Sequence, residues 1–211
     1  MTSLVERLKS RFIVIDGPDG AGKSTQLSLL ADWLTGRGTR IIEARDPGGT
    51  AVGDRIRDIL LDKDHREMAV ECELMLYMAS RAQLVREVIR PAMKLGKCVL
   101  CDRYVSATVA YQGAGGLDVE AIRSVGRIAV GGLLPDLTLI LDVPAEQGLA
   151  RLKGSPDRME AKDLEFHRRV REAFLRQAAD QPERFAVVDA AGPVEQVQVV
   201  LQHTIEAWTF E

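Results

Sequence analysis

Five short apolar runs recur along the chain, and segments with helical periodicity separate them. The runs cover residues 12–15, 41–42, 98–101, 137–141 and 185–188. Their apolar residues are continuous rather than alternating, which is typical of parallel strands that are covered on both faces. Strands that alternate with helices predict an α/β fold, here an open, mostly parallel five-stranded sheet with helices on both faces. Ligands of such sheets bind at the carboxyl ends of the strands.

Helical periodicity fills most of the intervals between the apolar runs. We expect helices in residues 23–34, 52–59, 71–90, 119–130, 144–152, 166–174 and 194–208. In the first of these, apolar side chains recur three or four residues apart, which is the spacing of one helical face. The helix at 71–90 is expected to end there, because Pro91 follows it.

The size and composition of the chain predict one compact domain over residues 1–211. The 211 residues are 46% hydrophobic and 28% charged, close to the average for globular domains. The net charge of −3 argues against a protein that holds nucleic acid mainly through phosphates. We find no apolar stretch of membrane-spanning length, and the charged N-terminus is unlike a secretory signal peptide. We therefore expect a cytoplasmic protein that binds neither nucleic acid nor membranes.

A glycine-rich turn between the first apolar run and the first helix carries the strongest motif in the chain. Residues 17–24 read GPDGAGKS and match G-x-x-x-x-G-K-[ST]. In such a loop backbone N–H groups surround a phosphate, and the N-terminus of the next helix adds partial positive charge. The residues predicted to bind ATP are Gly17, Pro18, Asp19, Gly20, Ala21, Gly22, Lys23, Ser24 and Thr25. Lys23 is predicted to be catalytic, because it can reach the β- and γ-phosphates.

Asp102 and Arg103 directly follow the apolar run at 98–101. A carboxylate at a strand end beside a phosphate loop is suited to hold Mg²⁺, directly or through water. We predict Ser24 and Asp102 as the ligands of a Mg²⁺ cofactor. Arg103 can neutralise phosphate charge, so Asp102 and Arg103 are both predicted to be catalytic.

A second glycine-rich turn, with the sequence RDPGGT at residues 45–50, follows the second apolar run. The guanidinium of Arg45 and the N–H groups of the next helix could bind an anion there. Two phosphate sites in one small domain suggest that donor and acceptor are both phosphorylated. We therefore predict phosphoryl transfer between nucleotides, with Arg45 in a catalytic role. A plain turn with a solvated arginine is the alternative.

These motifs, with others further along the chain, resemble the thymidylate kinases among the P-loop nucleoside monophosphate kinases. Residues 17–25 are similar to the family's G-x-[DE]-G-x-G-K-[ST]-T, and residues 45–50 resemble its R-E-P-G-G-T, with Asp46 in place of Glu. Further matches are residues 102–104 to D-R-Y, 110–113 to A-Y-Q-G and 157–160 to D-R-x-E. The resemblance implies a P-loop NTPase fold, transfer of the ATP γ-phosphate to dTMP to give dTDP, Mg²⁺ as cofactor and a homodimer.

The resemblance also implies an acceptor site. The residues implied to face the thymine base are Tyr77, which stacks on the ring, Arg81, which approaches O4, and Thr108. The other residues implied to bind dTMP are Tyr111 at the sugar, Asp19 at the 3′-hydroxyl, Arg45 and Arg103 at the phosphate, and Gln112. Asp19 is also predicted to be catalytic. The sequence departs from the family at Ala107, where many members carry Ser and where the nearest hydroxyl is that of Ser106.

A short lid at about residues 151–160 is implied to supply a catalytic cation. In this family the cation comes from the phosphate loop or from the lid, and the loop position here is Gly20, as in the bacterial type. The candidates in the lid are Arg151, Lys153 and Arg158. Asp157 and Glu160 have the spacing of a capping box, which would place Arg158 in the first turn of a helix. A cation is unfavourable there unless it binds an anion, which weakly favours Arg158.

Two alternatives stay open at this point. One is a non-catalytic P-loop regulator that binds ATP, although it would need neither the Arg45 turn nor a base-stacking helix. The other is a kinase for a different deoxynucleotide or deoxynucleoside, because base choice depends on the shape of the pocket. A GTPase is excluded, since its guanine-reading N-K-x-D motif cannot occur in a chain without asparagine.

Overall fold

The computed structural model describes residues 3–65 and 67–210, so Arg66 and both ends of the predicted domain lie outside the described residues. One sheet with strand order β2-β3-β1-β4-β5 forms its centre, and each neighbouring pair is parallel. The strands are β1 (Phe12–Asp16), β2 (Ile41–Arg45), β3 (Cys98–Asp102), β4 (Leu137–Asp142) and β5 (Phe185–Asp189). The α/β prediction is confirmed, and each strand contains the apolar run that predicted it.

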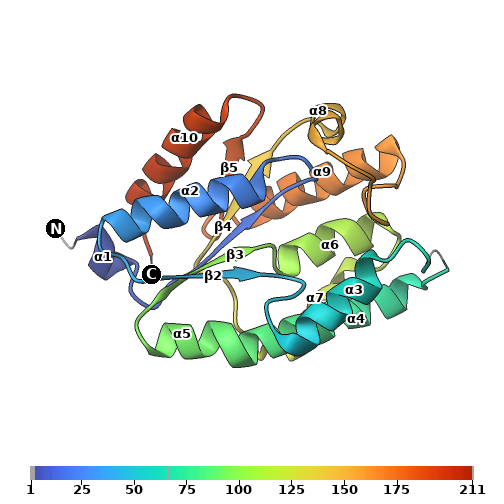
Figure 1. The fold of residues 1–211 in the computed structure, drawn as a ribbon, viewed down its shortest axis with the longest axis horizontal. Helices are drawn as coiled ribbons and strands as arrows, with labels where there is room; N and C mark the ends of the chain where they lie inside the picture. The colour runs from blue at the N-terminus through green and yellow to red at the C-terminus, as the bar shows by residue number, and fades with distance from the viewer. Residues whose placement is uncertain (1–2, 66, 211) are drawn as a thin grey trace.

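Helices cover both faces of the sheet (Figure 1). One face is covered by α2 (Lys23–Gly36) and α10 (Val194–Ala207). The other face is covered by η1 (Val85–Ile89), α5 (Arg90–Lys94), α6 (Val105–Ala114) and α9 (Leu164–Asp180). The remaining described helices are α1 (Leu4–Arg7), α3 (Ala51–Leu61), α4 (Val70–Leu84), α7 (Val119–Val130) and α8 (Ala145–Arg151). None of the described helices has the length and apolar character that a membrane crossing requires.

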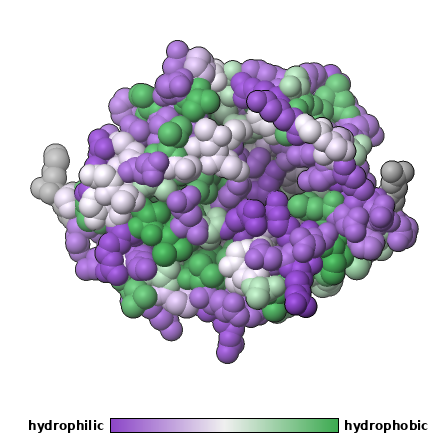
Figure 2. All heavy atoms as spheres, viewed as in Figure 1, coloured by the Kyte–Doolittle hydropathy of each residue, from purple (hydrophilic) through white to green (hydrophobic). Residues whose placement is uncertain are grey.

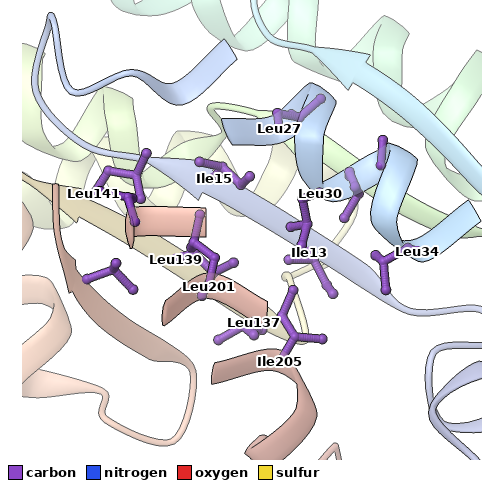
Figure 3. Close-up of a cluster of buried hydrophobic side chains, with 14 of the residues drawn as sticks. Ile13, Ile15, Leu27, Leu30, Leu34, Leu137, Leu139, Leu141, Leu201 and Ile205 are labelled. Carbon is purple, nitrogen blue, oxygen red and sulfur yellow. The ribbon is translucent and has the colours of Figure 1, made fainter. Parts of the chain in front are cut away.

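Side chains of the central strand point alternately into two separate cores. Ile13 and Ile15 of β1 pack with α2 and α10 (Figure 3), while Phe12 and Val14 pack on the opposite face. All four are fully buried, which explains why the run is continuously apolar. Burial of side chains of this size contributes about 1.5–3 kcal/mol each before entropy is counted. The two cores therefore hold the end of β1, where the phosphate loop begins, in one position.

The helical segment expected to end before Pro91 continues through it. A π-helical turn, η1, follows α4, and the N–H of Arg90 bonds to the carbonyl of Val85 five residues earlier. Pro91 then occupies the first turn of α5, where a missing N–H costs nothing. The prediction that the helix ends at residue 90 is therefore wrong, because the wider turn accommodates the proline.

The helix α6 was not predicted from periodicity. Seven consecutive residues, 106–112, are buried on it, polar and apolar ones alike, so it has no exposed polar face that would reveal a helical period. It lies between the sheet and other helices, and it carries the family's A-Y-Q-G segment. Its position beside the carboxyl ends of the strands brings that segment to the site.

Two glycines allow the phosphate loop to pack directly on α8. Gly20 has a φ of +72°, and a Cβ atom placed on it would lie 1.9 Å from the carbonyl oxygen of Gly148. A Cβ on Gly148 would lie 2.4 Å from the carbonyl oxygen of Asp19. Both neighbours are backbone atoms, so neither can move aside without shifting the loop. The sequence analysis did not predict this contact, although a glycine inside the helix predicted at 144–152 is a signal that could have revealed it.

Gly148→Ala should therefore displace the phosphate loop. We expect a loss of about 1–3 kcal/mol in the free energy of unfolding from overpacking, even though alanine favours a helix. The value of kcat/KM should fall for both nucleotides. Urea denaturation and steady-state kinetics measure the two effects. Gly36→Ala is the matched control, because Gly36 is also helical but has no atom within 4 Å of a Cβ. Equal stability of the two variants would contradict the close approach.

Candidate active site

A cavity of about 410 Å³ opens at the carboxyl ends of β1, β2 and β3. The parallel register brings these ends together, since Asp102 of β3 is paired with Ile15 of β1 and Arg45 of β2. Residues of the phosphate loop, α3, α4, α6 and the lid complete its walls. Figure 2 shows a hollow with mainly hydrophilic walls on this side of the molecule. The cavity lies where the strand ends predict a ligand site.

The phosphate loop surrounds Lys23 at the start of α2. The Lys23 Nζ atom donates hydrogen bonds to the carbonyl oxygens of Gly17 (3.1 Å) and Pro18 (2.7 Å). Burial lowers the pKa of Lys23 to about 8, and the charge of Arg103 lowers it as well. Gly22, the N-cap of α2, has a φ of 86°, which residues with a side chain rarely adopt. The loop thus places a buried ammonium group beside the N-terminus of a helix, an arrangement suited to phosphate.

Ser24 and Asp102 meet at the wall of the cavity. The Ser24 hydroxyl donates a hydrogen bond to Asp102 Oδ2 at 2.8 Å. Both offer oxygen atoms, the ligand type that Mg²⁺ prefers. In residues 3–65 and 67–210, no group of three His, Cys, Asp or Glu side chains could hold a metal ion. Mg²⁺ is usually bound by one or two carboxylates with phosphate oxygens and water, and the oxygens of this pair fit that mode of binding.

Arg103 joins β1, the phosphate loop and α6. Its φ is 68°, an uncommon conformation for a residue with a side chain. Its guanidinium donates to Asp16 Oδ1 (3.3 Å), the Gly17 carbonyl (3.1 Å), Asp19 Oδ1 (2.5 Å) and the Tyr111 hydroxyl (3.1 Å). Burial raises the pKa of Asp16, although the charge of Arg103 opposes that shift. One side chain therefore connects the three elements that border the cavity.

Ser106 supports this network from behind the cavity. Its hydroxyl donates a hydrogen bond to Asp16 Oδ2 at 2.7 Å. Ala107 lines the cavity and brings only a methyl group to it. The hydroxyl of Ser106, one residue before the position where many family members carry Ser, therefore orients the buried carboxylate of Asp16. Sequence reasoning had not singled out Asp16, because a carboxylate at a strand end is also a common turn residue.

Asp19 lies between Arg103 and a histidine from a distant segment. Its Oδ1 pairs with Arg103, and its Oδ2 lies 3.8 Å from His167 Nδ1. Burial opposes the charged form of Asp19, but Arg103 and Lys23 outweigh it and lower the pKa of this carboxyl group. His167 is buried on α9 and lies far from the loop in sequence, so no motif spacing could reveal it.

The turn that follows β2 brings two arginines to the cavity. Arg45 is exposed, and its Nη2 atom lies 3.7 Å from Asp54 Oδ1. Arg57 of α3 also lines the cavity and donates to the carbonyl of Pro47 at 3.1 Å. Burial lowers the pKa of Arg57, and the charge of Arg45 lowers it further. The sequence predicted the helix that carries Arg57 but not which of its faces borders the site.

Five predicted residues line the cavity from α4 and α6: Tyr77, Arg81, Thr108, Tyr111 and Gln112. Arg81 is almost fully buried, is paired with Asp46, and donates a hydrogen bond to Thr108 Oγ1 at 3.0 Å. Burial raises the pKa of Tyr77, and the carboxylate of Glu73 raises it further. The side chain of Arg81 is thus fixed by protein contacts rather than solvated.

The lid differs from the prediction because residues 158–161 form a turn and not a helix. The hydrogen bonds of a capping box are present: Asp157 Oδ1 accepts from the N–H groups of Met159 (2.8 Å) and Glu160 (2.9 Å), and Glu160 Oε2 accepts from that of Asp157 (3.0 Å). The next helix begins at Leu164 after its own N-cap, Asp163. The prediction that Arg158 lies in the first turn of a helix is therefore wrong.

None of the three lid cations is among the described residues that line the cavity. Arg151 donates to two backbone carbonyl oxygens after β5, at 2.9 and 2.7 Å. Arg158 pairs with Glu73 and donates to the carbonyl of Leu60 at 3.0 Å, while Lys153 is exposed. The role of a lid cation at the transferring phosphate therefore stays a prediction.

Most of the predicted site residues share the walls of this one cavity. Those that line it are Asp19, Gly20, Gly22, Lys23, Ser24, Thr25, Arg45, Tyr77, Arg81, Asp102, Arg103, Thr108, Tyr111 and Gln112. Predicted residues outside its walls are Gly17, Pro18, Ala21, Arg151, Lys153 and Arg158. Further lining residues are Asp46, Pro47, Arg57, Leu61, Ala107, Leu152, Asp157, Met159 and Glu160.

A family model described as thymidylate kinase matches residues 15–200. The chain belongs to the thymidylate kinase family. Thymidylate kinases of an Exiguobacterium species and of Deinococcus radiodurans are each 48% identical to it, over 94% and 89% of this chain and 96% and 92% of their own. A crystal structure of thymidylate kinase from Ehrlichia chaffeensis matches with a TM-score of 0.79 at 28% identity, covering 94% of this chain and 99% of that one. The family resemblance and its P-loop fold are thus confirmed.

Lys23 should make the capture of ATP sensitive to alkaline pH. With a pKa of about 8, the ammonium group of the free enzyme loses its proton as the pH rises through 8, and the neutral amine attracts phosphate less. Bound phosphates favour the charged form and raise this pKa. We therefore expect kcat/KM for ATP to fall about tenfold between pH 7 and 9, with kcat declining only at higher pH.

The pH profile of Lys23→Arg is the control, because a guanidinium keeps its charge over this range. That variant should be less active and should show no such fall in kcat/KM. A wild-type profile that stays flat to pH 9 would contradict the assignment.

Proposed function

We propose that this chain transfers the γ-phosphate of ATP to dTMP and so makes dTDP for dTTP synthesis. The observation that supports this most strongly is that a phosphate loop and a second, arginine-bearing turn border the same cavity. One turn suits the phosphates of the donor and the other suits the phosphate of the acceptor. Membership of the thymidylate kinase family supports dTMP as the acceptor.

The reaction needs positioning and charge neutralisation rather than a covalent enzyme intermediate. An oxygen of the dTMP phosphate attacks the γ-phosphorus. The bond from that phosphorus to the β,γ-bridging oxygen breaks, and ADP leaves with the electron pair. Lys23 neutralises the β- and γ-phosphates, and backbone N–H groups of the phosphate loop, which Pro18 lacks, bind them. Arg45 and Arg103 hold the acceptor phosphate, and Asp19, which Arg103 orients, accepts a hydrogen bond from the 3′-hydroxyl.

Ser24 and Asp102 would hold Mg²⁺, which when bound neutralises charge on the β- and γ-phosphates. Their mutual hydrogen bond keeps a hydroxyl and a carboxylate at one point of the cavity wall. The lid residues Arg151, Lys153 and Arg158 could add a cation only after the lid moves, since all three lie outside the cavity walls.

The acceptor base is proposed to lie between α4 and α6. Tyr77 would stack on thymine, and Arg81 and Thr108 would face its polar edge. Tyr111 would contact the sugar, and Gln112 would complete the wall. The contacts of Arg81 with Asp46 and Thr108 support this role, because they fix a donor at the cavity wall before the base arrives.

A panel of acceptors tests the proposed function. With ATP and Mg²⁺, dTMP should be preferred over dUMP, dCMP, dGMP and thymidine. Arg45→Ala should raise KM for dTMP at least about tenfold and KM for ATP much less, because a charge-assisted contact worth about 1.5–3 kcal/mol is lost. Arg40→Ala is the control, since Arg40 is exposed before the amino end of β2. Tenfold better activity with thymidine or dCMP would refute dTMP as the substrate, and ATP hydrolysis without transfer would indicate a regulator.

We also propose that the chain works in the cytoplasm as a homodimer. Exposed apolar side chains lie on three helices that pack side by side: Val52 and Ile59 on α3, Met75 on α4 and Ile128 on α7. Ile128 is 83% exposed, an unfavourable state for an isoleucine unless a partner covers it.

Ile128→Glu should therefore convert the dimer to a monomer. Light scattering after size-exclusion chromatography would show the mass falling by half. Val199→Glu on α10 is the control, because Val199 is also exposed but lies outside this set. A wild-type monomer at micromolar concentration would refute the dimer.

A further inference from the structure

Glu73 is a buried carboxylate that touches both the acceptor pocket and the lid. It lies in the first turn of α4, one turn before Tyr77, and is only 5% exposed. Its two oxygens have different partners: Oε1 accepts a hydrogen bond from Gln112, and Oε2 pairs with Arg158. A buried carboxylate is costly unless its oxygens are paired, so both contacts are needed to keep it there.

The contact with Gln112 orients an amide group at the cavity wall. Gln112 Nε2 donates to Glu73 Oε1 at 2.6 Å, and the glutamine is only 1% exposed. Because a carboxylate only accepts hydrogen bonds, the nitrogen and not the oxygen of this amide must face Glu73. The amide oxygen and the second N–H are then held in one orientation toward the remaining neighbours of Gln112.

The contact of Glu73 with Arg158 holds the lid beside the first turn of α4. The Arg158 Nε atom donates to the carbonyl of Leu60, one of the last carbonyls of α3, at 3.0 Å. Such carbonyls lack a partner within the helix and carry partial negative charge, so a guanidinium stabilises them. The next residue, Met159, is buried and packs with Tyr111 in the same core cluster. The turn at residues 157–160 is therefore held by α3 and α4 through Arg158 and by α6 through Met159.

We infer that Glu73 is a positioning residue that links occupancy of the acceptor site to the position of the lid. It fixes the amide of Gln112 with one oxygen and the guanidinium of Arg158 with the other. A nucleotide in the pocket that contacts Gln112 and Tyr77 limits the motion of α4 and α6. Because Glu73 is paired with Arg158, the motion of the lid is then limited as well. This inference rests on the proposed function, because it takes the pocket between α4 and α6 as the site of dTMP.

Hydrogen exchange of the wild-type protein tests the link without any substitution. Addition of dTMP alone, without ATP, should slow amide exchange at residues 157–163 at least threefold. Addition of ADP and Mg²⁺ alone should slow amide exchange in the phosphate loop but have less effect on exchange at residues 157–163. Unchanged exchange at residues 157–163 with saturating dTMP would overturn the inference.

Glu73→Gln removes the charge but preserves the shape of the side chain. It should abolish the effect of dTMP on the lid and raise KM for dTMP about tenfold, with KM for ATP changing less than twofold. Glu71→Gln is the matched control, since Glu71 lies in the same first turn of α4 but is exposed. It should behave as wild type. Slower exchange of the lid with dTMP in Glu73→Gln would overturn the inference.

A double-mutant cycle with Arg158→Gln separates a link from two independent roles. If Glu73 acts through Arg158, the double variant should raise KM for dTMP no more than the stronger single variant. Additive effects would overturn the inference. A large fall in kcat for Arg158→Gln with unchanged KM for dTMP would also overturn it, because Arg158 would then act at the transferring phosphate. If Glu73→Gln does not fold, the kinetics of Arg158→Gln and the exchange data of the wild-type protein still test whether the acceptor site and the lid are linked.

The same assays distinguish failure of this inference from failure of the proposed function. Wild-type transfer to dTMP is measured first, and its absence would refute the function itself. Normal transfer together with an unresponsive lid or additive effects would refute only the link through Glu73.

Discussion

The partly buried guanidinium of Arg103 is the group on which the arrangement of the site depends. It bonds at once to the end of β1, to the phosphate loop and to α6, and its backbone adopts a left-handed conformation to do so. Without it, the fully buried carboxylate of Asp16 would keep, among the described residues, hydrogen bonds from the hydroxyl of Ser106 and the N–H of Gly17. An unpaired buried charge is costly, so the network has one stable geometry. The site is therefore organised before any nucleotide binds, which is what catalysis by positioning requires.

The parallel sheet supplies the frame for this network. Strands that all run in one direction present all their carboxyl ends at one edge, so residues from distant parts of the chain meet there. The register pairs Arg45 and Ile15 with Asp102, which brings the turn at residues 45–50, the proposed metal ligand and the phosphate loop together. Glycines at the crowded points permit the backbone to pass: Gly20 and Gly148 meet where no Cβ atom would fit. Backbone contacts as well as side-chain contacts therefore fix the position of the phosphate loop.

The side of the cavity that we propose for the acceptor is organised by buried ion pairs. Asp46 holds Arg81, and Glu73 holds Arg158 while it also orients Gln112. Buried pairs of this kind contribute little net stability, because desolvation offsets the Coulomb attraction. They do impose one orientation on each polar group, which suits a pocket that must distinguish nucleotide bases. The lid belongs to this side of the site, since its turn is anchored on α3, α4 and the core around Tyr111.

The sequence by itself determined the five strands, their α/β class and the two glycine-rich turns, because apolar runs and glycine motifs act locally. It also identified the family, since the motifs occur in a diagnostic order. Only the tertiary structure decided the partners of Asp16, His167, Arg57 and Glu73, which come from segments far apart in the chain. It also decided that α6 is a helix with no exposed polar face, and that Pro91 lies inside a helical segment after a π turn. The capping box of the lid formed its hydrogen bonds yet no helix, because Arg158 and Met159 are held by contacts with other elements. Local patterns specify local geometry, whereas the direction of a buried charge depends on which distant partner the fold brings to it.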